Sequence, residues 1–174
     1  SRGGALHLSS VLPAISSAIG HPIPTAIHAD PKRLQEALGL PDARSAVVVL
    51  VDGLGYWNIN MRLGHSPYLR SLMADSVNQR PIATCMPSTT VAAMSTFGTG
   101  TCPGLTGMTG YTQLNPDNGE ICQLISFKNA PAPLKLQQQP TIFERLAEQD
   151  VRVTSSGLPK FAFSALTQAD RKST

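Results

Sequence analysis

The sequence has little charge and no long apolar run, and each shortage excludes a class of protein. Only 14% of the 174 residues are charged, which is low for a protein surface of this size. We therefore expect part of that surface to be buried against another part of the protein. The basic residues are scattered along the chain, so no stripe of positive charge is available for nucleic acid. No run of about 18 apolar residues exists, so the sequence predicts no membrane-spanning segment.

Cysteine and histidine are also scarce. The three cysteines, Cys85, Cys102 and Cys122, are an odd number and lack the spacing of metal ligands or of a disulfide framework. They fit a reducing compartment, so we expect a cytoplasmic location. The alternative that stays open is a targeting signal that was removed from upstream of this sequence. The four histidines are not spaced as ligands beside carboxylates, and we interpret all of them as surface residues: His7, His21, His28 and His65.

The first pattern with chemical content lies at residues 45–55. Five aliphatic residues, Val47 to Val51, are followed by Asp52 and by glycines at positions 53 and 55. A run that is apolar on both faces is typical of a strand buried in a parallel sheet. Open α/β sheets bind ligands at the carboxyl ends of their strands, which is where Asp52 stands. The same letters also fit a plain strand that enters a turn.

The second pattern lies at residues 86–97. Pro87 and three hydroxyl residues, Ser88, Thr89 and Thr90, come directly before a short predicted helix. A hydroxyl at a helix start is surrounded by unpaired N–H groups and a partial positive charge. Such a place can bind phosphate and hold a nucleophile against it. The alternative is that these hydroxyl residues only cap the helix and have no catalytic role.

In their order and spacing these segments resemble the alkaline phosphatase superfamily, and within it the type I phosphodiesterase/nucleotide pyrophosphatase family. Asp52-Gly53 matches the end of the family's hydrophobic strand, and Pro87-Ser88-Thr89-Thr90 matches its Pro-x-x-Thr nucleophile motif. Gly100, ten residues after Thr90, and the turn at residues 103–107 extend the match. The resemblance implies that Asp52 and Thr90 ligate one zinc ion and that Thr90 is the catalytic nucleophile.

Two departures from the family pattern concern single residues. The family has an Asn about twenty residues after the nucleophile, but the count from Thr90 reaches Tyr111. A tyrosine hydroxyl could bind a phosphoryl oxygen in its place, so Tyr111 is the candidate substrate-binding residue. Cys85 resembles the start of the sulfatase signature, but Thr89 stands where that signature has Arg. We expect Cys85 to pack as a small apolar residue.

A third departure concerns the metal ligands. A site for two zinc ions needs about six protein ligands, and no histidine follows Asp52 in ligand spacing with a carboxylate. The resemblance implies that most ligands lie beyond residue 174, in a missing carboxyl-terminal half. We expect a lead-in segment at residues 1–44 and the amino-terminal part of the α/β domain at residues 45–174. This part alone should be inactive.

The expected fold is an α/β domain with a mostly parallel central sheet and helices on both faces, incomplete in this chain. The implied function is metal-dependent hydrolysis of phosphodiester or nucleotide pyrophosphate bonds through a phospho-threonine intermediate. Its substrate is a small anionic phosphoester, with nucleotides among the candidates. Two alternatives stay open. One is another hydrolase of the superfamily, acting on phosphomonoesters or phosphonates, and the other is a non-enzymatic α/β domain that binds an anion or a partner.

Local patterns predict the remaining elements. Asp30 and Pro31 start a helix that Gly39 ends, and Thr141 and Glu144 form a capping box at the start of another. Further helices are predicted at residues 8–19, 56–61 and from Ser66, strands at residues 77–84 and 151–154, and a hairpin at residues 111–126 around Asn115–Gly119.

Overall fold

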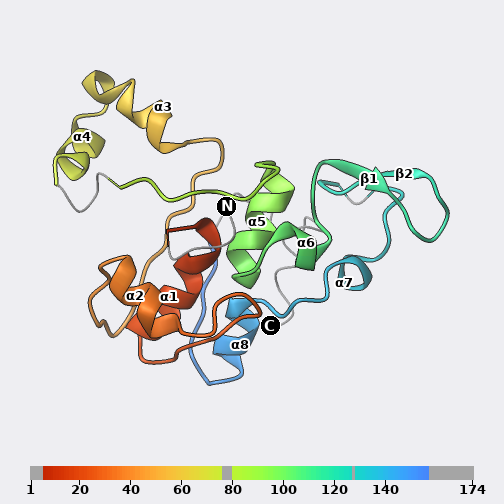
Figure 1. Cartoon of the computed structure of the whole chain (residues 1–174), viewed down its shortest axis with the longest axis horizontal. Coiled ribbons are helices and arrows are strands. Elements are labelled where there is room, and N and C mark those ends of the chain that lie inside the picture. The colour runs from red at the N-terminus through yellow and green to blue at the C-terminus, as the bar shows by residue number, and fades with distance from the viewer. Residues whose placement is uncertain (1–5, 76–79, 127, 157–174) are drawn as a thin grey trace.

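The computed structural model describes residues 6–75, 80–126 and 128–156 (Figure 1). Within these residues the chain is mainly helical, with one small antiparallel sheet. The elements in chain order are the 3-10 helix η1 (Leu8–Ser10), α1 (Val11–Ala18), α2 (Pro31–Ala37), α3 (Tyr56–Asn60), the 3-10 helix η2 (Leu63–His65), α4 (Pro67–Met73), α5 (Thr90–Thr99), α6 (Pro103–Thr106), β1 (Thr112–Leu114), β2 (Ile121–Gln123), α7 (Pro133–Leu136) and α8 (Ile142–Ala147).

Helix α5 lies at the centre of the packing because it contributes to both apolar clusters. At its carboxyl-terminal end Phe97 packs into a cluster where α1, α5 and α8 meet (Figure 1). Its other buried residues are Leu12 of α1, Ile23 of the segment after α1, and Ile142 and Leu146 of α8. At its amino-terminal end Val91 packs against Met108 and two residues of the hairpin region, Cys122 and Leu124. Burial at both ends therefore fixes the position of α5, whose first residue is Thr90.

The predicted parallel sheet does not form among the residues that the structure describes, although helices with a small sheet are consistent with part of an α/β domain. Residues 45–51 form no strand, and their aliphatic side chains are exposed, Val47 at 92% and Val49 at 80%. The β1–β2 pair is the only sheet among all the residues that the structure describes. An apolar run reports that a segment is suited to burial, but a parallel strand also needs neighbouring strands and covering helices. No described segment supplies them, so the run stays exposed.

The other two predicted strands do not form as expected. Residues 77–79 lie outside the described residues, and of residues 80–84 only Ala83 makes a bridge, which is parallel and pairs with His7. Residues 151–154 have no regular structure. Both segments are short, and the pairing of a short strand depends on distant partners.

The predictions that rested on local capping and turn chemistry are confirmed. The Asp30 carboxylate accepts a hydrogen bond from the N–H of Arg33 at 3.1 Å and starts α2 at Pro31. Thr141 and Glu144 form the reciprocal capping box of α8. The hairpin pairs β1 with β2, with Gln113 opposite Cys122. These contacts span few residues, so the sequence specifies them directly.

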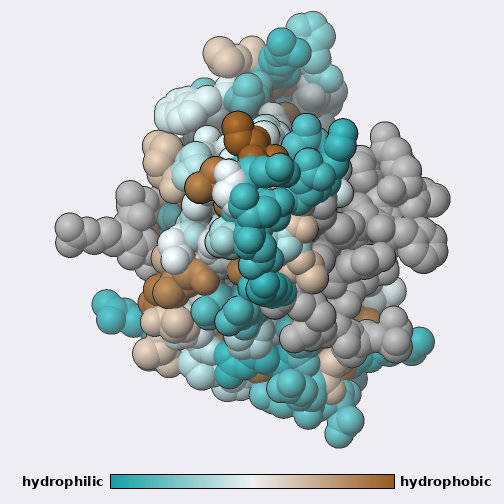
Figure 2. Space-filling model, turned by 90° about the vertical axis from the view of Figure 1, so that its right-hand side faces the viewer, coloured by the Kyte–Doolittle hydropathy of each residue, from teal (hydrophilic) through white to brown (hydrophobic). Residues whose placement is uncertain are grey.

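Helices α3 and α4 project from the rest of the described chain (Figure 1). Neither helix has a buried residue, and several of their large side chains are exposed: Trp57 at 67%, Tyr68 at 73% and Leu72 at 44%. On the hairpin side of the molecule, apolar residues gather in patches among hydrophilic ones (Figure 2). The paired residues Leu114 and Ile121 are both exposed in the hairpin. No described helix is long and apolar enough to cross a membrane.

Candidate active site

Thr90 is placed by the start of helix α5. The preceding residue, Thr89, is extended and serves as the N-cap, because its Oγ1 accepts a hydrogen bond from the N–H of Ala92 at 3.3 Å. The same Oγ1 donates to the carbonyl oxygen of Thr109 at 3.4 Å. Val91 is fully buried, while Thr90 is only half-buried. Thr89 therefore has a structural role as a cap, and the Thr90 hydroxyl stays free to make contacts outside the helix.

The Thr90 hydroxyl contacts both other residues that the sequence singled out. Its Oγ1 donates to Oδ2 of Asp52 at 2.8 Å and lies 3.0 Å from the hydroxyl oxygen of Tyr111. A threonine hydroxyl has one proton, and here that proton points to Asp52. The Tyr111 hydroxyl must therefore be the donor to Thr90. Asp52, Thr90 and Tyr111 thus form a chain of two directed hydrogen bonds.

Two segments distant in sequence bring Asp52 and Tyr111 to the start of α5. Gly53 adopts a left-handed conformation, with φ of 71°, at the turn directly after Asp52. On the other side, the carbonyl oxygen of Tyr111 accepts a hydrogen bond from the N–H of Leu124 at 2.7 Å, which ties Tyr111 to the hairpin. Asp52 and Tyr111 are both exposed, so a substrate in solution can reach the three hydroxyl and carboxylate groups.

The donor set at this site is too small to hold a metal ion by itself. Asp52 and Thr90 offer oxygen atoms, which divalent cations bind, but a zinc ion takes about four ligands. Among the described residues no three His, Cys, Asp or Glu side chains are grouped so that they could hold a metal. The carboxylate and the alcohol fit a metal site in kind, whereas their number does not complete one.

The remaining candidates have structural surroundings. Cys85 is buried, as expected, and its Sγ donates to the carbonyl oxygen of Pro87 at 3.4 Å. The interpretation of all four histidines as surface residues is wrong for His7 and His28, which are 3% and 5% exposed. His28 contacts the buried Ser9 and His7 pairs with Ala83, and a pattern within one short segment cannot reveal either distant partner.

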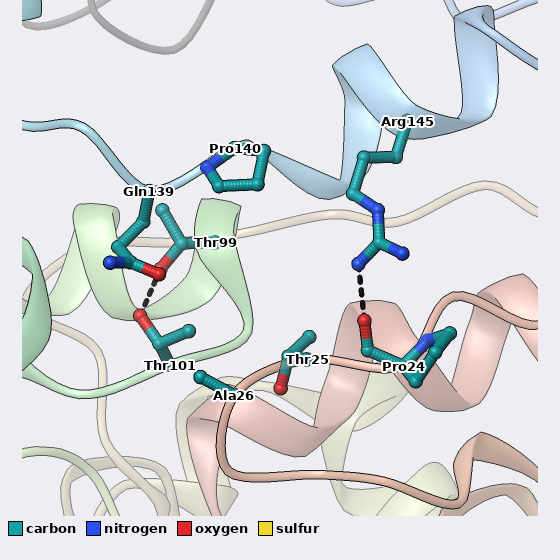
Figure 3. Close-up of a pocket in the computed structure, with 8 residues that line it drawn as sticks. All are labelled: Pro24, Thr25, Ala26, Thr99, Thr101, Gln139, Pro140 and Arg145. Carbon is teal, nitrogen blue, oxygen red and sulfur yellow. Dashed lines mark hydrogen bonds between the residues drawn. The ribbon is translucent and has the colours of Figure 1, made fainter.

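The hollow drawn in Figure 3 is lined by residues other than Asp52, Thr90 and Tyr111, and its hydroxyl groups are already engaged in hydrogen bonds within the protein. Thr25 donates its hydroxyl proton to the carbonyl oxygen of Gly100, and Thr99 donates to that of Ser95. The Thr101 hydroxyl therefore donates to Thr99 at 2.7 Å, which leaves none of these hydroxyl protons for a ligand. Arg145 donates to the carbonyl oxygen of Pro24 (Figure 3). We assign no function to this hollow.

Comparison with known protein families identifies the class of protein. Residues 46–171 match the type I phosphodiesterase/nucleotide pyrophosphatase family, a match that begins at the predicted strand and covers most of the chain. The chain belongs to this family, which lies in the alkaline phosphatase superfamily. Comparisons with curated proteins and with solved structures gave no match. Family membership indicates a hydrolase of the phosphodiesterase/pyrophosphatase kind.

Proposed function

We propose that this domain hydrolyses phosphodiester or nucleotide pyrophosphate bonds, with Thr90 as the nucleophile that becomes transiently phosphorylated. The observation that supports the proposal is the contact between Thr90 and Asp52, in which a hydroxyl at the start of a helix donates to a carboxylate at 2.8 Å. A nucleophile beside a group that can take its proton is the arrangement that covalent catalysis requires. The substrate is a small anionic phosphoester.

The proposed reaction starts with the proton of Thr90. As Thr90 Oγ1 attacks phosphorus, its proton leaves along the hydrogen bond toward Asp52. A P–O bond forms to Thr90, and the P–O bond to the leaving group breaks in line with it. The leaving oxygen takes a proton from solvent. A water molecule then attacks phosphorus and the P–O bond to Thr90 breaks, after which Thr90 Oγ1 regains its proton from Asp52. The amino-terminal end of α5 favours the added negative charge on the phosphoryl oxygens, because its peptide dipoles are positive there.

Tyr111 is proposed as the group that holds the substrate. Its hydroxyl donates to Thr90 in the free protein, by the proton count given above. Once a phosphoryl group lies against Thr90, the same O–H is within reach of a phosphoryl oxygen. It can then donate to that oxygen instead of to Thr90. Tyr111 would thereby do what an amide side chain does at this position in related proteins.

We propose zinc as the cofactor, with Asp52 and Thr90 as two of its ligands and with its other ligands outside the described residues. A bound divalent metal supplies Lewis acidity and makes an alcohol a better nucleophile at neutral pH. Because two ligands hold a metal weakly, we expect the 174-residue chain to show little turnover. Robust hydrolysis of a chromogenic phosphodiester by this chain, lost on addition of EDTA, would contradict that expectation.

The nucleophile is tested by substitution in a form of the protein that carries a complete metal site. Thr90→Ala should lower phosphodiester turnover by several orders of magnitude, because it removes the attacking oxygen. Thr90→Ser keeps a hydroxyl at the same place and should retain measurable turnover. Ser88→Ala is the matched control on a neighbouring exposed hydroxyl and should change turnover little. If Thr90→Ala keeps most of the activity, the nucleophile is assigned to the wrong residue.

A further inference from the structure

A buried chain of hydrogen bonds joins His7, Ser9 and His28, away from the catalytic residues. The Ser9 side chain is fully buried between the two rings. Its Oγ lies 2.8 Å from Nδ1 of His7 and 2.8 Å from Nε2 of His28. Both histidines have little exposed surface, and the proposed reaction uses neither of them.

The hydrogen bonds show where an extra proton on His7 would go and which contact it would cost. The backbone N–H of Ser9 donates to Nδ1 of His7 at 3.1 Å, so this nitrogen is an acceptor and carries no proton. The neutral ring therefore carries its proton on Nε2, and a hydrogen bond to the Thr84 backbone raises the pKa of the ring. A proton added to His7 must therefore go on Nδ1, where it can donate to Oγ of Ser9 but leaves the backbone N–H of Ser9 without its acceptor. Protonation of His7 breaks this contact.

Burial also favours the neutral form of both rings. Desolvation is the main cause that lowers the pKa of His7, opposed by the hydrogen bond to the Thr84 backbone. Desolvation likewise lowers the pKa of His28, and repulsion from His7 adds to it. Helices η1 and α5 have no ionisable side chain, and residues 83–85 contribute only the thiol of Cys85. No carboxylate in these segments offsets a charge on either ring.

At the His7 end, this group of hydrogen-bonded residues contacts the segment that leads to Thr90. His7 pairs with Ala83 in a parallel bridge. The N–H of Leu8 donates to the carbonyl oxygen of Ala83 at 2.8 Å, and the N–H of Ala83 donates to that of Leu6 at 2.9 Å. The chain continues from Ala83 to Thr90 within seven residues. The position of His7 therefore affects where the segment between Ala83 and the start of α5 lies.

At the His28 end, the hydrogen-bonded residues are connected to the carboxyl-terminal end of α5. The N–H of Thr25 donates to the carbonyl oxygen of His28 at 2.8 Å. The Thr25 hydroxyl donates to the carbonyl oxygen of Gly100, the C-cap of α5, also at 2.8 Å. The two histidines thus belong to the segments that hold both ends of this helix.

We propose that His7, Ser9 and His28 form an acid-sensitive latch that fastens residues 6–10 to residues 83–84 and, through residues 25–28, to the end of α5. When His7 takes up a proton, η1 loses the cap that Nδ1 of His7 gives to the N–H of Ser9, and the hold of residues 6–10 on residues 83–84 weakens. Because both folded-state pKa values are lowered, the unfolded or released chain binds more protons than the latched one below about pH 6.5. The latch is thus closed above that pH and opens progressively as the pH falls.

Amide hydrogen exchange of the 174-residue chain, measured by NMR between pH 5 and 8, tests the latch directly. The protection factors of the Leu8 and Ala83 amides should fall below pH 6.5, by up to about tenfold per pH unit for each histidine that titrates. The amide of Arg145, which donates to the carbonyl oxygen of Thr141 in α8 at 3.2 Å, is the internal reference and should fall less. Equal protection of Leu8 and Ala83 at pH 8 and pH 5 would overturn the proposal.

Matched variants then identify the titrating group. His7→Asn keeps a side-chain acceptor for the N–H of Ser9 but cannot titrate, so the acid-induced loss of protection should shrink at least about threefold. His65→Asn changes an exposed histidine in η2 and should leave that loss unchanged. Should His7→Asn fail to fold, His28→Gln measures the second ring in the same way. An undiminished loss in the folded latch variant would refute the latch. These measurements need no hydrolysis, so they are independent of the proposed function.

Discussion

The adjacent residues Thr89 and Thr90 separate stability from chemistry in one comparison. Thr89→Ala removes the N-cap of α5, whose hydrogen bond to the N–H of Ala92 is 3.3 Å long. A lost cap costs about 1 kcal/mol of unfolding free energy, and the length of this bond places the cost in the lower half of the usual range. The second, 3.4 Å contact to the carbonyl oxygen of Thr109 adds little, because Thr109 is exposed and water can replace it.

Thr90→Ala removes two hydrogen bonds, to Asp52 and Tyr111, but both partners are exposed and can bind water instead. We therefore expect it to cost less than Thr89→Ala, about 0.5 kcal/mol or below. At a slope of about 2 kcal/mol per molar urea, the Thr89 variant should shift the midpoint by about 0.5 M and the Thr90 variant by about half of that or less. Urea titrations of the 174-residue chain, followed by circular dichroism, measure both shifts.

The effect on turnover should be opposite in a form of the protein with a complete metal site. There Thr90→Ala should abolish phosphodiester hydrolysis, whereas Thr89→Ala should retain most of it once both variants are assayed well below their unfolding midpoints. The reasoning fails if Thr90→Ala is the more destabilising change, because Thr90 would then be a structural residue. It also fails if Thr89→Ala alone abolishes turnover, because the nucleophile would then be one residue earlier.

Two further predictions concern the frame around the site. Gly100→Ala should lower the unfolding free energy by about 1–3 kcal/mol, because φ is 63° there and a Cβ would lie 2.8 Å from Cγ of Pro13 and 2.9 Å from Cγ2 of Thr25; a urea midpoint equal to that of the unchanged chain would contradict this crowding. Thr141→Ala removes the cap of α8 and the acceptor for the N–H of Glu144, so thermal unfolding should show a loss of about 1 kcal/mol; the exposed Thr112→Ala is its control and should change the midpoint little.

The sequence by itself determined the elements whose signals are local. Asp30, Thr89 and Thr141 cap helices through bonds that reach only three residues along the chain. The turn residues between Asn115 and Gly119 set the hairpin, because their conformations depend on the residues themselves. The motif spacing also singled out Asp52, Thr90 and Tyr111 as candidate site residues, although their chemical roles stay predictions.

Only the tertiary structure decided the features that depend on distant partners. The apolar run at residues 45–51 has the composition of a buried strand, yet no described segment pairs with it, so it stays exposed. The direction of the hydrogen bonds at Thr90 follows from two contacts that span 38 and 21 residues. Likewise, His28 is buried where folding brings it against Ser9, and His7 is buried where it pairs with Ala83. A residue's type sets what it can bind, but its burial and its partners are set by packing between segments far apart in the chain.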